Sequence, residues 1–157
     1  MEKAILVVVG FILAFIPKWF DRKRKIRAHW NALSAEISRI EFKSNMFLKD
    51  NIQSPLYRLP FKSYETSFSM LLTEGAVKKD EVNALEAFYD LVQDINRGLD
   101  QTASAVSTKS DERVIEEYRR NQIKVNELIK GADDKEALIV KASEIVSKKC
   151  KLSLIQY

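Results

Sequence analysis

The residue types that carry most enzyme chemistry are scarce in this chain. It contains one histidine, His29, and one cysteine, Cys150, among 157 residues. Zinc sites need several Cys or His ligands, and a di-metal site in a helical bundle needs two Glu-x-x-His pairs. A Ser-His-Asp site would have to use His29. The sequence therefore predicts no catalytic residue, no metal ligand and no cofactor.

Two carboxylate pairs remain as groups that can bind a cation or share a proton. Asp90 and Asp94, and likewise Glu112 and Glu116, lie four residues apart, which places each pair on one face of a helix. In a chain with 31% charged residues, such pairs usually lie on a solvated face. The sequence has no glycine-rich phosphate loop and no G-x-S-x-G elbow. We therefore expect a protein that is not an enzyme.

The elements that position these residues begin with an apolar run. Residues 4–16, AILVVVGFILAFI, contain no charged side chain. A cleaved signal peptide is disfavoured, because bulky residues and Pro17 occupy the expected cleavage site. A buried core helix usually keeps a polar face, and this run has none. The sequence thus favours an uncleaved membrane anchor over residues 4–20, about 25 Å long. The residues expected in the anchor or at its interface are Ile5, Leu6, Val7, Phe11, Ile12, Leu13, Phe15, Ile16, Trp19 and Phe20.

The net charge of +4 is unevenly distributed. Residues 1–17 sum to zero, residues 18–30 to +5 and the remainder to −1. Positive charge next to an anchor favours the cytoplasmic side and attracts anionic lipid headgroups. We therefore expect a single-pass inner-membrane protein with its N-terminus outside, its C-terminal part cytoplasmic and no nucleic-acid partner. The residues expected to meet headgroups are Lys18, Arg22, Lys23, Arg24, Lys25 and Arg27.

The rest of the chain has the apolar spacing of helices. A heptad-like stripe runs from Ile26 to Phe47 and can face the protein's own bundle or a second copy. Further helices are expected from Ser63, which can cap the first of them, to a stop at Gly75, and then over residues 80–107. A helix that starts at Ser110 or Asp111 should end before Gly131, with Val114 or Ile115 in the core, and a last helix should start at Asp133. The predicted fold is all-α, with one N-terminal transmembrane helix followed by an antiparallel helical bundle. The predicted domains are an anchor (1–20), a basic collar (21–27) and a cytosolic bundle (28–157).

A proline-containing segment interrupts this helical pattern. Residues 51–63, NIQSPLYRLPFKS, form an unusually apolar loop, since Pro55 and Pro60 restrict the residues before them to extended geometry. The loop either packs across the end of the bundle or offers its surface to a partner. The residues that would contact such a partner are Leu56, Tyr57, Arg58, Leu59 and Phe61.

Four short patterns carry a resemblance over roughly residues 4–100. They are L-x-x-E-I at Leu33–Ile37 with Asn45 beyond it, LP-x-x-x-Y-E at 59–65, E-V-x-A-L-x-x-F-Y at 81–89, and I-N-x-x-L at 95–99. With the apolar run, the chain resembles a loose class of small, uncharacterised bacterial proteins that have one N-terminal membrane segment and a helical cytosolic part. The resemblance implies a bacterial inner membrane and assigns no activity or site residue.

These observations together predict a membrane-tethered, non-enzymatic interaction or scaffold module at the cytoplasmic face of a bacterial inner membrane. Its expected partners are anionic lipid headgroups and a second protein or a second copy of the chain. Two alternatives stay open at this point. One is an accessory subunit of a membrane enzyme or transport complex, and the other is a phage- or toxin-related accessory protein.

Overall fold

The stripe that starts at Ile26 lies on the longest helix of the protein, α1 (Glu2–Leu48). Its 47 residues span about 70 Å at about 1.5 Å per residue. The computed structural model describes the backbone of residues 2–49, 57–108, 111–132 and 136–155, and side chains within these segments from residue 16 to residue 151. Helix α1 continues without a break through Pro17 and through both predicted domain boundaries, so the division into domains stays a prediction.

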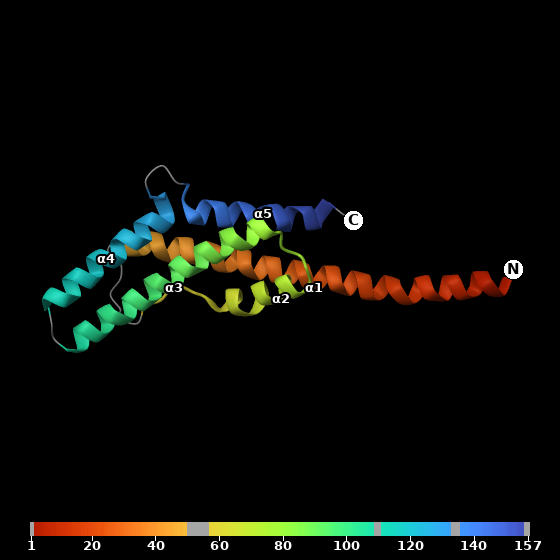
Figure 1. Ribbon diagram of the computed structural model, residues 1–157, viewed down its shortest axis with the longest axis horizontal. Helices are drawn as coiled ribbons and strands as arrows, with labels where there is room; N and C mark the ends of the chain where they lie inside the picture. Colours follow the sequence, from red (N-terminus) through yellow and green to blue (C-terminus); the bar gives the residue numbers. More distant parts are fainter. Residues whose placement is uncertain (1, 50–56, 109–110, 133–135, 156–157) are drawn as a thin grey trace.

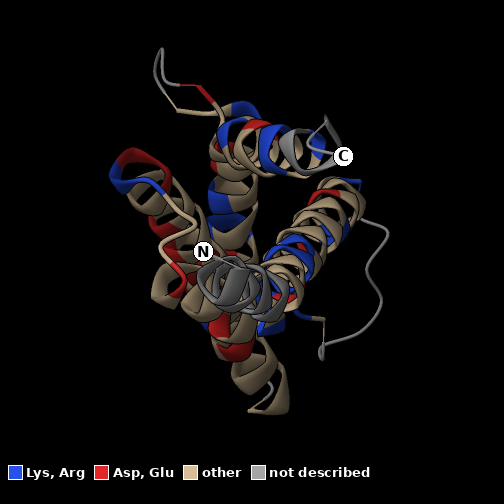
Figure 2. Cartoon of the chain, turned by 90° about the vertical axis from the view of Figure 1, so that its right-hand side faces the viewer, with Lys and Arg blue, Asp and Glu red and all other residues tan. Residues whose placement is uncertain are grey.

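Shorter helices pack along α1 and on one another. They are η1 (Tyr64–Phe68), α2 (Ser69–Thr73), α3 (Lys79–Ser107), α4 (Asp111–Lys130) and α5 (Leu138–Ile155). Helices α1 and α3 run in the same direction, while α4 returns along α3 and α5 returns along α1 (Figure 1). The described segments contain helices and no strand, so the prediction of an all-α helical bundle is confirmed. Viewed from the end at which the N-terminus lies, basic and acidic positions both occur along the helices of the bundle (Figure 2).

The apolar stripe of α1 is buried by the protein's own helices. Its side chains from Trp30 to Phe47 are at most 3% exposed. They join one core with α3 side chains such as Phe88 and Val92, and with residues of α4 and α5. Burial of this apolar surface is the main force that holds the helices together. The stripe therefore faces its own bundle, which was one of the two arrangements that its spacing allowed.

Helices α3 and α4 come into close contact where Gly98 faces Asn121. An alanine Cβ at Gly98 would lie 2.0 Å from Oδ1 of Asn121. Asn121 is buried and donates a 3.2 Å hydrogen bond from Nδ2 to Oγ1 of Thr102. The missing side chain of Gly98 therefore makes room for a buried amide.

Two predicted helix ends match the structure, whereas the start of α5 and the position of Ile115 differ from the prediction. Gly75 and Gly131 have φ values of 62° and 83°, the left-handed geometry that glycine adopts readily after a helix, so both predicted stops are confirmed. Helix α5 begins at Leu138 rather than Asp133, because its first turn closes on the carbonyl of Ala137; residues 133–135 lie outside the described part. Ile115, an alternative to Val114 for the core, is 65% exposed.

The predicted membrane localisation is wrong, because the lengths and compositions of the helices contradict it. In the described part of the chain, no helix combines the length and the apolar composition needed to cross a membrane. The physical reason lies in the length of the apolar run. Thirteen residues extend about 20 Å, against a hydrocarbon core of about 30 Å, and Lys18, Asp21 and Arg22 follow almost at once. A transmembrane helix and a single-pass inner-membrane orientation are therefore not supported.

Candidate interaction surface

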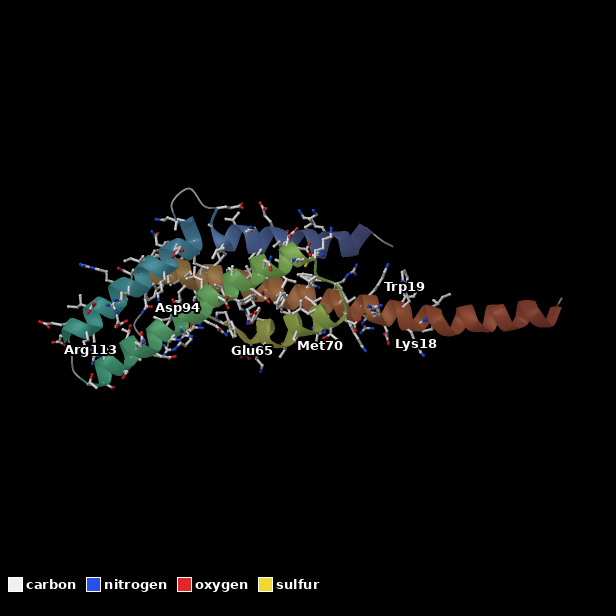
Figure 3. The ribbon with its side chains drawn as sticks, viewed as in Figure 1. Lys18, Trp19, Glu65, Met70, Asp94 and Arg113 are labelled. Carbon is white, nitrogen blue, oxygen red and sulfur yellow. The ribbon has the colours of Figure 1, made fainter. Side chains whose placement is uncertain are left out.

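The part of α1 that precedes the bundle exposes large apolar side chains. Ile16, Trp19 and Phe20 are 43%, 51% and 44% exposed. Trp19 and Lys18 extend from α1 beyond the end of α5 (Figure 3). The other predicted anchor residues, from Ile5 to Phe15, have side chains outside the described part. We call residues 16–25 the projecting segment.

Basic side chains surround the projecting segment along its length. Lys18, Arg22, Arg24 and Lys25 are exposed, and Lys23 is half-buried with its Nζ 3.8 Å from the centroid of the Trp19 ring. Arg22 forms a salt bridge with Glu74, with 2.7 Å between Nε and Oε2, and donates a second bond to the backbone carbonyl of the same residue. This double contact joins α1 to the residue that follows α2.

Arg27, the last of the predicted headgroup residues, is half-buried at the start of the bundle. Its charge acts on the thiol of Cys150, whose pKa is raised by burial and lowered in part by Arg27. Arg27 therefore belongs to the junction between the projecting segment and α5.

The described part of the proline loop is fastened to the bundle. Leu59 is buried, and its backbone N–H and C=O both bond to the side-chain amide of Asn96, at 2.8 and 3.0 Å. The Tyr57 hydroxyl donates to the carbonyl of Lys43, and Arg58 pairs with Asp100. Phe61, half-buried, packs against the core, while Leu56 lies outside the described residues. These contacts leave little apolar surface of residues 57–61 for a partner.

A buried carboxylate organises the segment after the loop. Glu36, only 5% exposed, accepts hydrogen bonds from the backbone N–H of Ser63 at 2.6 Å and of Tyr64 at 3.1 Å, and from the hydroxyl of Tyr89 at 3.2 Å. The sequence predicted that Ser63 itself would cap this helix, but its side chain makes no capping bond. The side chain of Glu36 on α1 caps this helix instead. In the sequence, the signal for this cap is a charged residue within the apolar stripe of α1.

Several of the groups with possible chemistry make structural contacts. His29 Nδ1 lies 3.2 Å from Oγ of Ser67. Asp94 pairs with Lys124 at 2.7 Å, and Glu116 pairs with Arg120 at 2.5 Å. Among the described residues, no three His, Cys, Asp or Glu side chains come together as metal ligands would. The two carboxylate pairs thus lie on charged helix surfaces.

A second exposed apolar surface lies on α4. Ile115 and Ile123 are 65% and 63% exposed and lie eight residues apart on one face of the helix. Shallow hollows of about 260 and 360 Å³ flank them, with Arg119 common to both. A larger open groove of about 740 Å³ lies elsewhere, between Glu41 of α1 and one face of α5. Sequence periodicity missed the α4 surface, because it placed Ile115 among the candidates for the core.

Comparison with known proteins gives no relative from which a role can be taken. No protein-family model, no curated protein and no solved structure matches this chain.

Proposed function

We propose that this protein is a non-enzymatic helical module that binds a partner through the projecting segment of α1. The supporting observation is the exposure of Ile16, Trp19 and Phe20 within five residues of one another, in a region rich in basic side chains. Single exposed apolar residues are common, but a cluster of large ones bounded by polar groups is typical of a binding surface.

The bundle supports this role by holding the segment in place. Helix α1 carries the segment and the buried stripe on one continuous backbone, and the contact of Arg22 with Glu74 braces the base of the segment. An interaction element on such a rigid scaffold loses little conformational entropy when it binds. The closed core and the fastened proline loop leave the segment as the best-exposed of the predicted site residues.

A photo-crosslinking pair on α1 tests the proposal. Phe20 and Phe42 are exposed phenylalanines of the same helix, 44% and 66% exposed. Each is replaced in turn by benzoylphenylalanine in cells that make the chain. We expect an adduct of defined mass from position 20 and none from position 42. No adduct at position 20, or equal adducts at both positions, would contradict the proposal.

The α4 surface suits a second candidate function, contact with another protein or a second copy. Ile115 and Ile123 are the observation that favours it, since the remainder of the outer face is polar or charged. Light scattering of the intact chain should then give a mass above that of a monomer, and I115S/I123S should lower it. A monomeric mass for the unaltered chain at all concentrations would refute self-association through this face.

A further inference from the structure

The projecting segment places two kinds of side chain in order along the helix axis. Trp19 is followed one turn later by Lys23, and Phe20 by Arg24. One turn is about 5.4 Å, so each of these two rings lies nearer the N-terminus than the cation that follows it, while Lys18 lies just before both rings. The structure already shows one such pair in contact, with the Lys23 ammonium over the Trp19 ring.

The basic side chains also surround the helix rather than line one face. At about 100° per residue, Lys18, Arg22 and Lys25 lie on one side, while Lys23 and Arg24 lie on others. Arg22 pairs with Glu74 and Lys23 lies over Trp19, so a partner would meet Lys18 and Lys25 on one side and Arg24 on another. A folded protein partner covers one face of a helix and would reach only one of these two sides. A lipid surface met end-on provides phosphates on every side, with less polar material beyond them.

We infer that the partner of the projecting segment is an anionic lipid surface. The basic side chains contact headgroup phosphates, and Trp19 and Phe20 lie at the boundary between headgroups and acyl chains, where amphipathic aromatic rings are favoured. The inference concerns this headgroup contact alone and requires no helix to cross the lipid. It rests on the proposed function, whose binding element it shares.

Vesicle flotation of the intact chain tests this partner. Phosphatidylcholine vesicles are compared with vesicles that also contain phosphatidylglycerol. We expect binding to the anionic vesicles that weakens from 0.1 M to 1 M salt, as the Debye length falls from about 10 Å to about 3 Å. Trp19 reports the contact by a fluorescence blue shift, because Trp30 is 3% exposed and shielded from lipid. The shift should be absent in W19F. Equal binding to both kinds of vesicle, or an unchanged shift in W19F, would overturn the inference.

Two variants with the same change in net charge show whether lipid binding depends on the projecting segment or on the overall charge of the chain. K18Q/R24Q/K25Q removes three exposed cations from the segment, and R113Q/K130Q/K141Q removes three exposed cations from α4 and α5. At about 1 kcal/mol per basic residue near an anionic surface, the first variant should bind on the order of 100-fold more weakly. The second should bind like the unaltered chain. Equal losses in the two variants would overturn the inference.

The two proposals fail in different ways. If the chain ignores anionic vesicles while Phe20 still crosslinks to a protein, the lipid inference is overturned and the proposed function stands. If position 20 gives no adduct and the vesicles are ignored, both are overturned.

Discussion

Replacing Gly98 by alanine should destabilise the protein, although alanine is the better helix former. The new Cβ would lie 2.0 Å from Oδ1 and 2.9 Å from Cγ of Asn121, closer than unbonded atoms approach. Asn121 is 1% exposed, so its side chain has no open space into which to turn. Relief therefore requires α3 and α4 to move apart or the amide to leave its site.

The magnitude follows from three effects. Alanine in place of glycine gains about 1 kcal/mol within a helix. Overpacking of a close helix contact costs about 1–3 kcal/mol. Loss of the 3.2 Å bond from Asn121 to Thr102 leaves a buried donor unpaired and costs about 1–3 kcal/mol more. The net effect of G98A should be a loss of about 3 kcal/mol in the free energy of unfolding, or about 6–12 °C in Tm.

Urea unfolding followed by circular dichroism measures this change. The control is a double-mutant cycle with N121A, which removes the atoms that the new Cβ would meet. G98A/N121A should be more stable than the two single losses predict, since the residues are in contact. If G98A is instead more stable than the unaltered chain by about 1 kcal/mol, only helix propensity is at work. The close approach of α3 and α4 would then be refuted.

Three other predictions concern polar groups that are buried or half-buried. E36A should lower the free energy of unfolding by about 3 kcal/mol in urea titrations, because three donors lose their acceptor, whereas E36Q keeps the side-chain shape and should lose less; equal losses would contradict this. Burial raises the pKa of Tyr57 to about 12, and burial and the Glu36 charge raise the pKa of Tyr89. The folded state thus keeps these protons while unfolded tyrosines titrate near pH 10, so stability should fall as pH rises from about 10 towards 12, and Y89F should make the fall shallower. Burial also raises the pKa of the Cys150 thiol, so a disulfide reagent at pH 8 should react more slowly with the native chain than with the urea-unfolded chain; equal rates would show that the thiol is open.

The sequence predicts the helices well because their signals are local. The spacing from Trp30 to Phe47 specifies an apolar face, and Gly75 and Gly131 mark stops through their backbone freedom. Both kinds of signal depend on residues within a few positions of one another. They need no knowledge of the tertiary structure, and the structure confirms them.

The features that the sequence missed depend on partners far along the chain. Glu36 caps a helix 27 residues away, and Asn96 holds the backbone of Leu59 from 37 residues away. Periodicity also leaves Val114 and Ile115 nearly equivalent, and the choice depends on how α4 is rotated against α3. The residues of the candidate surface are identified from the sequence. The sequence assigns Ile16, Trp19 and Phe20 to a membrane anchor or its interface, and the basic residues to lipid headgroups.

Because the backbone of α1 is unbroken, its length sets the direction in which the projecting segment faces relative to the bundle. Each residue added to α1 between the bundle and the projecting segment turns the segment by about 100° and advances it by about 1.5 Å. Seven added residues turn it by only about 20° and advance it by about 10 Å. Binding of a protein partner that contacts one face of the helix would change with the angle of rotation. Binding to a lipid surface would change with the distance from the bundle. Insertions into α1 therefore distinguish a partner that binds one face of the helix from a partner that contacts all of its faces.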